Sequence, residues 1–263
     1  MTAIAGKRIW LTGASSGIGL SLAEQLAAAG AELILSARRE SLLNDLQQRL
    51  PHSERHRVLA LDLSDPEQAL VTAQAAQLGQ IDILINNAGV SQRSWVVDTE
   101  LAVYRQLMEV DYLAVVALTK WVLPEMLARG EGHIVTVSSV AGKVGTKLRS
   151  GYAGAKYAVL GFMDCLRAEV SQQGVVCSSI LPGFINTQVA HNALTGDGSQ
   201  RGRADGDNAS GMSADACAKQ IIAAIQHNRD EVVIAKGMSK LAPLLQRFMP
   251  GTLRRIMAKR AVD

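Results

Sequence analysis

The stretch RIWLTGASSGIGLSLAEQLAAAG, residues 8–30, joins an apolar run to a helical pattern through a glycine-rich turn. Leu22 and Leu26 fall on one helical face, and Gly30 is placed to end the helix just beyond its last residue. The turn itself, TGASSGIG at 12–19, offers flexible backbone and free N–H groups at a helix start, which favour a bound phosphate. Its glycine spacing differs from the common GxGxxG pattern, so a plain strand-to-helix turn is the alternative.

The alternation of short apolar runs and helical patterns continues along the chain. Five further runs, rich in β-branched residues, lie at 32–37, 57–63, 81–89, 132–139 and 175–183. Helical patterns separate them near 41–50, 64–78, 99–129 and 152–172, and Ser64 is the expected N-cap of the second. A helix at about 213–227 and a strand at 231–235 follow. Because no hairpin signal joins the runs, residues 1–263 are predicted to form a single α/β domain, a Rossmann-like doubly wound parallel sheet of about seven strands with helices on both faces.

Two segments near the C-terminus depart from this alternation. Residues 188–213 are polar and glycine-rich, and we expect them to form a lid over a substrate site. Residues 238–263 are basic and amphipathic, with apolar residues on two short helical faces: Leu241, Leu244, Leu245, Phe248 and Met249, then Leu253, Ile256 and Met257 after Pro250 and Gly251. The favoured interpretation is a segment packed on the domain or at a subunit interface. The alternative is a weak peripheral membrane contact or a site for an amphiphilic, anionic substrate.

Charge and composition exclude several classes of function. The net charge is +3, but residues 236–263 hold seven of the 27 basic residues and one of the 24 acidic ones. A nucleic-acid binder would carry a broad basic face with aromatic residues, which make up only 4% of this chain, so no nucleic acid is expected as a partner. The five histidines show no metal-ligand spacing, so no metal site is predicted.

The cysteines and the first residues bear on the cellular compartment. Cys165, Cys177 and Cys217 show no CxxC spacing and lie in apolar or helical surroundings, which predicts reduced thiols in the core. The N-terminal sequence has no basic segment followed by an apolar one, and no apolar run approaches the roughly 20 residues of a membrane span. We therefore expect a cytoplasmic protein.

The end of the second apolar run, LSARRE at 35–40, bears on the choice of dinucleotide. An acidic residue there would bind the ribose 2′-hydroxyl of NAD(H), whereas Arg38 and Arg39 would accept the 2′-phosphate of NADP(H). This favours NADP(H), with a solvated arginine pair as the alternative. Asp62 ends the third run, where it could accept a hydrogen bond from an adenine amino group or serve as a structural carboxylate.

The segment RSGYAGAKYAVLGF, residues 149–162, places a lysine between two tyrosines. On a helix, Tyr152 and Lys156 share a face, while Tyr157 points about a quarter turn away and is expected to pack. A free phenol titrates near 10, so acid–base work near neutrality needs a shift of roughly three units, or about 4 kcal/mol, which a nearby ammonium in a dry site can supply. Ser139, at the end of the fifth run, would donate a hydrogen bond to a substrate carbonyl oxygen.

Taken together, these motifs resemble the short-chain dehydrogenase/reductase (SDR) family across nearly the full chain. The matching features are TGASSGIG at 12–19, NNAG at 86–89, Ser139 thirteen residues before the tyrosine of YAGAK at 152–156, and PGFINT at 182–187. The segments VDYLAVVALTK and DCLRAEV further resemble the branch of animal membrane-anchored dehydrogenase/reductase proteins and, more distantly, the 11β-hydroxysteroid dehydrogenases. This chain is expected to lack their N-terminal anchor.

The resemblance implies specific catalytic roles. Ser139 would orient and polarise a carbonyl, Tyr152 would pass a proton, and Lys156 would favour the ionised tyrosine and bind the nicotinamide ribose. A fourth catalytic residue in the family is an asparagine, and the matching position here is Asp111. A carboxylate near Lys156 would stabilise its ammonium and weaken the effect of the lysine on Tyr152, so we predict a functioning proton relay with an altered pH profile. The alternative is that Asp111 is simply tolerated.

The resemblance also implies an NADP(H) site and an oligomer. The residues expected to hold the cofactor are Gly13, Ser15, Ser16, Gly17, Ile18, Gly19, Arg38, Arg39, Asp62, Leu63, Asn87, Ala88, Gly89, Tyr152, Lys156, Pro182, Gly183, Ile185 and Thr187. Trp95 is expected to pack in preference to contacting substrate. A homodimer or homotetramer is expected.

The predicted activity is an NADP(H)-dependent carbonyl reductase, or the reverse alcohol dehydrogenase, acting on a small-molecule ketone or secondary alcohol that is hydrophobic or acyl-chain-like. Two alternatives stand beside it. The chain could be a non-catalytic NADP(H)-binding sensor or scaffold, or it could oxidise a polar alcohol or sugar with NAD. Arg38 and the apolar C-terminal segment argue against the last of these.

Overall fold

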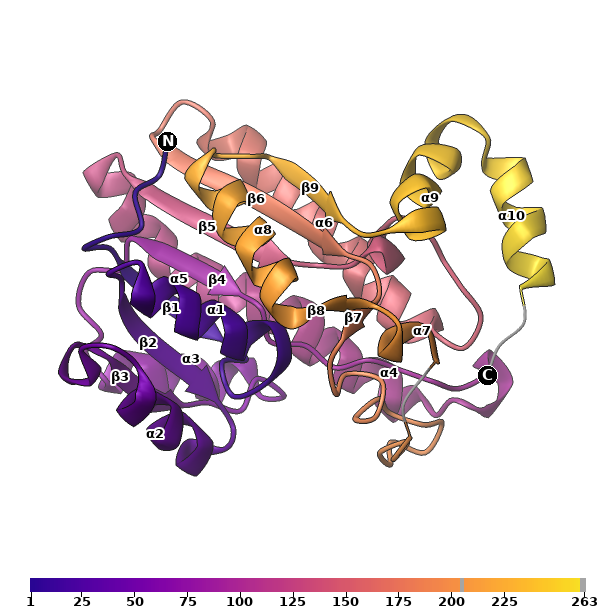
Figure 1. Cartoon of the computed structure of the whole chain (residues 1–263), viewed down its shortest axis with the longest axis horizontal. Coiled ribbons are helices and arrows are strands. Elements are labelled where there is room, and N and C mark those ends of the chain that lie inside the picture. The colour runs from indigo at the N-terminus through magenta and orange to yellow at the C-terminus, as the bar shows by residue number, and fades with distance from the viewer. Residues whose placement is uncertain (204–205, 261–263) are drawn as a thin grey trace.

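A computed structural model describes residues 1–203 and 206–260 of the chain, and at its centre is a seven-stranded sheet (Figure 1). The strand order is β3-β2-β1-β4-β5-β6-β9, and every neighbouring pair is parallel. The strands are β1 (Arg8–Thr12), β2 (Glu32–Ala37), β3 (Arg57–Ala60), β4 (Ile83–Asn86), β5 (Gly132–Val137), β6 (Val175–Pro182) and β9 (Glu231–Ile234). The predicted doubly wound parallel sheet is therefore confirmed, although β3 is shorter than its apolar run.

Helices cover both faces of the sheet because each strand presents alternate side chains to opposite sides. Along β1, Ile9 and Leu11 belong to one buried cluster, whereas Trp10 belongs to the other. The first cluster packs under α1 (Gly17–Ala28), α2 (Glu40–Arg49) and α8 (Ala214–Gln226). The second packs under α3 (Pro66–Ala75), α5 (Ala114–Arg129) and α6 (Ser150–Val170), on the far side in Figure 1.

The strand order reverses direction between β1 and β4, which are neighbours in the sheet. From β1 the chain winds outward through β2 and β3, and it then returns to β4 and winds the other way. At such a switch point the loops at the carboxyl ends of the strands separate and leave a crevice, where open α/β sheets bind their ligands.

The second helical pattern begins one residue later than predicted. Asp65, and not Ser64, is the N-cap of α3, and its carboxylate accepts a hydrogen bond from the backbone N–H of Gln68 at 3.0 Å. Pro66 follows as the first helical residue, where its missing N–H costs nothing. The Ser64 hydroxyl instead donates to Asp62 at 2.8 Å, so Ser64 stabilises the preceding turn.

The long helical region predicted near 99–129 is not a continuous α-helix. It consists of α4 (Leu101–Met108), a π-helical turn at Glu109–Leu113, and α5. A π-helical turn accommodates an extra residue and is common at functional sites. Here it carries Asp111, whose side chain is fully buried behind the crevice.

Three side chains that were expected to pack are more exposed than the sequence suggested. Tyr157 is 43% exposed, Trp95 is 48% exposed, and Cys165 is exposed, whereas the other two cysteines are buried as predicted. Tyr157 and Cys165 lie on the face of α6 opposite Met163, which packs against the sheet. Trp95 follows β4 in a surface loop. The prediction of a core thiol is therefore wrong for Cys165, whereas Tyr157 and Trp95 pack only in part and do not line the cavity described below.

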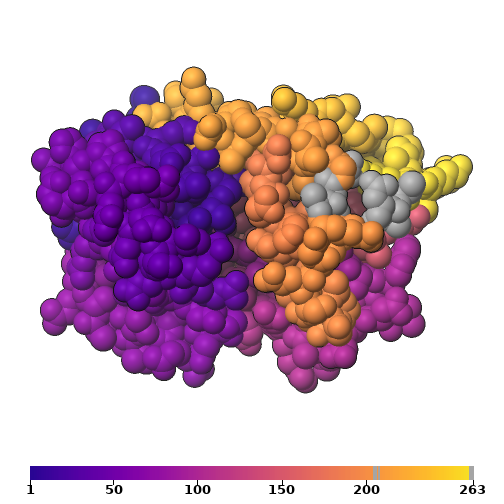
Figure 2. Space-filling view, turned by 60° about the horizontal axis from the view of Figure 1, so that its bottom comes forward, coloured from indigo at the N-terminus to yellow at the C-terminus, as the bar shows by residue number. Residues whose placement is uncertain are grey.

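Short regular elements lie within the predicted lid at 188–213 and just before it. β7 (Ile185–Asn186) pairs with β8 (Met212–Ser213), and α7 (Gly206–Ala209) lies between them in the chain. Leu194 forms a bridge to Gln92, so the segment is attached to the loop after β4. Figure 2 shows this part of the chain, in orange, next to a hollow that separates it from the N-terminal half.

The C-terminal segment forms two helices, α9 (Gly237–Phe248) and α10 (Pro250–Lys259), at one end of the molecule (Figure 1). Ala242 and Leu253 are buried against Val144, but most of the apolar face is open: Leu244 is 57% exposed and Phe248 is 72% exposed. Within the described part of the chain, no helix has both the length and the apolarity that crossing a bilayer requires.

Candidate active site

A cavity of about 580 Å³ occupies the crevice at the carboxyl ends of the strands. Every residue predicted to hold the cofactor lines it, and so does Ser139. Asp111 does not line it, because it lies one layer deeper. Among the described residues, no group of histidine, cysteine or acidic side chains is arranged to hold a metal ion.

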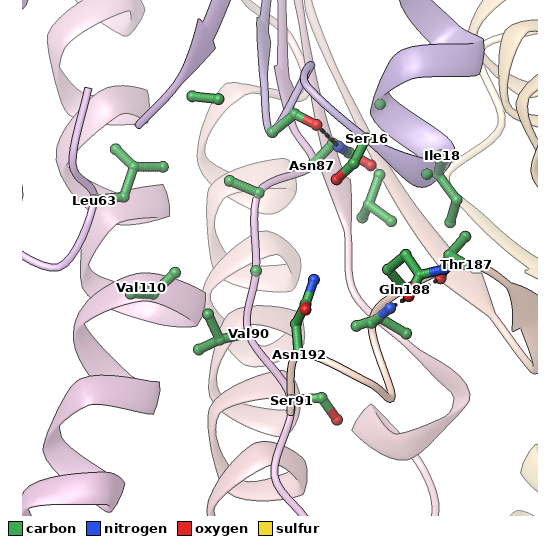
Figure 3. A pocket seen from close by; sticks show the side chains of 18 of the residues that line it. Ser16, Ile18, Leu63, Asn87, Val90, Ser91, Val110, Thr187, Gln188 and Asn192 are labelled. Carbon is green, nitrogen blue, oxygen red and sulfur yellow. Dashed lines mark hydrogen bonds between the residues drawn. The ribbon is translucent and has the colours of Figure 1, made fainter. Parts of the chain in front are cut away.

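The glycine-rich turn at 12–19 forms one wall of the cavity through close backbone packing. Gly13 has a φ of +69°, and a Cβ on it would lie 2.8 Å from the Cα of Ala88, so both conformation and space require glycine. The Asn87 amide donates to the carbonyl oxygen of Thr12 at 3.0 Å and braces this turn. Figure 3 shows Asn87 beside the turn and the lid residues Gln188 and Asn192 on the segment that borders the pocket.

Next to this turn, charged residues that follow β2 and β3 are exposed at the rim of the cavity. Arg38 and Arg39 follow β2, and the Arg39 guanidinium reaches the Ser15 hydroxyl at 3.5 Å. Asp62 accepts hydrogen bonds from both the N–H and the hydroxyl of Ser64, which holds its carboxylate in a tight turn. The two guanidinium groups are therefore available at a rim that is open to water.

Helix α6 brings Tyr152 and Lys156 to the cavity on one face, as their spacing predicts. The Lys156 ammonium lies 5.8 Å from the centre of the Tyr152 ring and donates to the carbonyl oxygen of Val137 at 3.3 Å. Only 4% of Lys156 is exposed, so its charge acts in a medium where electrostatic interactions are strong. Tyr157 does not reach this site.

Ser139 faces the same cavity from the end of β5, and its hydroxyl is oriented by backbone contacts. It accepts a hydrogen bond from the N–H of Ala141 at 3.1 Å and approaches the carbonyl oxygen of Pro182 at 3.4 Å. The hydrogen bond to Pro182 is long, so the hydroxyl can turn to donate to a better acceptor. Ser139 can therefore donate to an oxygen atom of a bound molecule.

Asp111 lies behind Lys156 as a fully buried carboxyl group. Its Oδ1 accepts the N–H of Val90 at 2.9 Å and lies 3.7 Å from the Lys156 ammonium, while its Oδ2 has no hydrogen-bond partner among the described residues. Burial disfavours the charged carboxylate and raises the pKa of Asp111 to about 6, although Lys156 and the Val90 N–H oppose this. Asp111 therefore changes charge close to neutral pH.

Gly89 provides the space in which this pair meets. A Cβ on Gly89 would lie 2.7 Å from Oδ1 of Asp111 and 3.2 Å from the Lys156 ammonium. Glycine is therefore required at this position of the NNAG segment for a steric reason. Any side chain would separate the two charged groups or push them away from the cavity.

Sequence reasoning missed the individual residues with which the lid, the loop after β4, α4 and the π-helical turn complete the cavity. They include Val90, Ser91, Gln106, Val110, Gln188, Asn192, Leu194 and Gln200. The polar, glycine-rich composition of 188–213 predicted a lid, but it contains no periodic pattern from which the inward-facing side chains could be chosen. Gln106 and Val110 are i and i+4 across α4 and the π-helical turn, so only their helical spacing could have suggested a shared face.

The fold and the residues around the cavity are those of a Rossmann-like oxidoreductase domain. The family model described as short chain dehydrogenase matches residues 7–197. The chain belongs to the short-chain dehydrogenase/reductase family, and its relatives place it in the branch of dehydrogenase/reductase SDR family members 7 and 7B.

The similarity to relatives extends over most of the chain. It is 41% identical over 262 residues to dehydrogenase/reductase SDR family member 7B of Bos taurus, covering 95% of this chain and 80% of the relative. It is 39% identical over 250 residues to member 7 of Homo sapiens, covering 92% of this chain and 74% of that protein.

Solved structures show the same fold. A short-chain dehydrogenase from Sphingobium yanoikuyae in complex with NADPH is 26% identical, with a TM-score of 0.76 and coverage of 98% of this chain and 99% of that one. A short-chain dehydrogenase/reductase from Burkholderia phymatum in complex with NAD has a TM-score of 0.79 at 24% identity, with coverage of 100% and 99%, and shows likeness of fold alone.

Proposed function

We propose that this chain is an NADP(H)-dependent carbonyl reductase, or the reverse alcohol dehydrogenase, acting on a ketone or secondary alcohol. The observation that carries the proposal is that Ser139, Tyr152 and Lys156 line the same cavity as the glycine-rich turn. Acid–base groups and a phosphate-binding turn on one cavity are what hydride transfer between a dinucleotide and a carbonyl requires. The bound nicotinamide would supply the hydride.

The side chains of α6 and β5 then have distinct tasks. Ser139 donates a hydrogen bond to the carbonyl oxygen and orients it, and Tyr152 donates the proton that this oxygen needs when the alcohol forms. The Lys156 ammonium, 5.8 Å from the tyrosine ring, stabilises the tyrosinate that remains. Asp111 acts on the ammonium from behind and takes no part in the contact with substrate.

The preference for NADP(H) is supported by Arg38 and Arg39 at the rim of the cavity. Their guanidinium groups suit a 2′-phosphate, since charge-assisted hydrogen bonds of this kind contribute about 1.5–3 kcal/mol. Arg38→Ala should raise the KM for NADPH by roughly tenfold to a hundredfold and leave the KM for NADH nearly unchanged. The matched control is Arg55→Ala, which removes an exposed arginine outside the cavity. Equal loss with both cofactors would contradict the preference.

Turnover itself is tested with a panel of ketones that spans steroids, long-chain acyl ketones and small diketones. The oxidation of NADPH is measured with each ketone, and NADH is the comparison. Tyr152→Phe should lower kcat by about two to four powers of ten and keep cofactor binding. Tyr157→Phe removes the neighbouring exposed phenol and should leave kcat unchanged. Retained turnover in Tyr152→Phe would refute the assignment. NADPH binding without oxidation by any ketone would favour the sensor or scaffold, and preferential oxidation of sugars with NAD would favour the second alternative.

The substrate is proposed to be hydrophobic or acyl-chain-like with a polar group. Val90, Val110 and Leu194 give the lid side of the cavity apolar surface, and the amides of Gln106 and Asn192 border it. The extended apolar part of a ketone would displace water from the apolar side chains, and a polar group on the same molecule would hydrogen-bond the amides. A long-chain ketone should therefore show a lower KM than a small diketone.

The exposed face of α9 and α10 is proposed to make a weak, reversible contact with an anionic lipid surface. Residues 237–260 hold six basic side chains and no acidic one, and they present the exposed Leu244 and Phe248. Near anionic lipid, each basic residue contributes about 1 kcal/mol, and apolar side chains bury themselves at the headgroup boundary. Charge complementarity thus supports lipid over a second, equally basic copy of the same face.

This contact is tested by co-sedimentation with phosphatidylcholine vesicles that contain or lack phosphatidylserine. Binding should require phosphatidylserine and should be reduced by Phe248→Glu. Val71→Glu, on the 56% exposed Val71 of α3, is the matched control and should have no effect. No binding by the intact protein would overturn the proposal, and a Phe248→Glu variant that only dissociates an oligomer would assign the face to a second copy.

The location of the protein is proposed to be cytoplasmic, with a homodimer or homotetramer as its assembly. The cysteines support this compartment. All three lie in the described part of the chain and form no disulfide, which is typical of a reducing environment. Family membership supports the oligomer. Light scattering of the purified protein tests the assembly, and fractionation of cells tests the location.

A further inference from the structure

Gln92 is a completely buried amide between the loop after β4 and the start of helix α6. Its Oε1 accepts two hydrogen bonds, from the backbone N–H of Gly151 at 2.7 Å and from that of Tyr152 at 3.2 Å. The first N–H groups of a helix have no partner within the helix, and Arg149, the N-cap residue just before α6, makes no side-chain cap. Gln92 fills this role from a segment about sixty residues earlier.

The other end of the amide is fixed equally well. Its Nε2 donates to the hydroxyl oxygens of Ser94 at 3.0 Å and Thr99 at 3.2 Å. The Thr99 hydroxyl donates its own hydrogen bond to the carbonyl oxygen of Trp95, so its oxygen can accept one from Gln92. Reversing the amide would set two donors against the N–H groups of α6, and this excludes the opposite orientation.

The backbone around Gln92 is held by the lid. The N–H of Leu194 donates to the carbonyl oxygen of Ser91, and the N–H of Arg93 donates to the carbonyl oxygen of Leu194, both at 2.8 Å. Leu194 and Ser91 line the cavity, whereas Gln92 does not. The residue therefore stands between the wall that receives a substrate and the helix turn that carries Tyr152.

We propose that Gln92 is a positioning residue, which holds the first turn of α6 in register with the lid so that the Tyr152 phenol stays near Ser139 and Lys156. It acts through Tyr152 and touches no reacting atom. This inference rests on the proposed carbonyl reductase function. Loss of the amide would release the turn, move the phenol away from the Lys156 ammonium, and make the tyrosine a poorer acid–base group.

The test compares three variants in the full-length protein with NADPH and the best ketone from the panel. Gln92→Met keeps the volume and removes every hydrogen bond of the amide. It should lower kcat at least tenfold, change the KM less than kcat, and alter the pH profile of kcat. Gln92→Glu, which restores the acceptor when its buried carboxyl is protonated, should recover kcat to within threefold of wild type. Thr99→Val removes one partner of Nε2 without touching α6 and is the matched control.

Unchanged kcat and pH profile in Gln92→Met would overturn the proposal, as would an equal loss in Thr99→Val, because both outcomes assign the amide to support of the fold. NADPH affinity within twofold of wild type shows that the variants are folded. If Gln92→Met does not fold, amide hydrogen exchange in the wild-type protein decides. The backbone amide hydrogens of Gly151 and Tyr152 should exchange more slowly than those in the first turn of a helix without a cap. Rapid exchange of these two amides would refute the cap. This readout needs no turnover, so it separates failure of the cap from failure of the proposed function.

Discussion

Replacing Asp111 by asparagine should change how the stability of the fold depends on pH. The folded pKa of Asp111 is about 6 and its unfolded value is 3.8. The wild-type fold therefore loses stability as pH rises through this interval, because the unfolded chain releases its proton first. A shift of about two units corresponds to roughly 3 kcal/mol. The asparagine variant has no proton to release, so its stability relative to wild type should improve by that amount between about pH 4 and pH 7.

The assay is denaturant unfolding of both proteins at intervals across this range. Other titrations, including that of His133, are common to both proteins and cancel in the difference. Asp197→Asn is the matched control: hydrogen bonds from Thr195 and Ser199 hold the pKa of Asp197 below its usual range, so its titration lies below this interval and its difference from wild type should stay constant. A difference in the free energy of unfolding between wild type and Asp111→Asn that stays constant with pH would refute the reasoning.

The pH dependence of kcat is a second, independent measurement of the same carboxyl group. Above pH 6 the carboxylate should weaken the action of Lys156 on Tyr152, so an unchanged pH profile of kcat in Asp111→Asn would remove Asp111 from catalysis.

Three further outcomes follow from the geometry. Burial lowers the pKa of His133 to about 4, so wild type should lose about 3 kcal/mol of stability as pH falls from 6.5 towards 4, and unfolding of His133→Asn should show a shallower loss. Gly13→Ala should weaken NADPH binding measured by fluorescence titration, whereas Gly145→Ala, where a Cβ meets nothing within 4 Å, should not. Asp65→Ala should lower the free energy of unfolding by about 1 kcal/mol through loss of the α3 cap, and Ser64→Ala should lower it less.

The sheet and the tyrosine–lysine pair could be predicted because each depends on local periodicity. Apolar runs such as 132–139 report burial on both faces directly, and i, i+4 spacing fixes Tyr152 and Lys156 on one side of a helix. The choice between Ser64 and Asp65 as the N-cap could not be settled in this way, since both residue types cap helices and they are adjacent. Their difference lies in Pro66, whose place at the first helical position selects the residue before it.

Exposure of individual side chains was harder to predict because it depends on the neighbours that a helix meets. Tyr157 and Cys165 both occur in an apolar helix, but the partner layer reaches only the face of α6 that carries Met163. Gln92 was missed for a related reason. Its role arises from contacts with Gly151 and Tyr152, about sixty residues away, and no local pattern marks a glutamine in a loop as a helix cap.

The loop that follows β4 organises helix α6 from several directions at once. Gly89 clears the space in which Lys156 approaches Asp111, and the N–H of Val90 fixes the carboxyl oxygen of that aspartate. Three residues on from Gly89, Gln92 holds the first turn of α6. Because these contacts share one short segment, a shift of its backbone would disturb both the charge behind the lysine and the position of the tyrosine. The two groups on which the proposed proton transfer depends are therefore coupled through this loop.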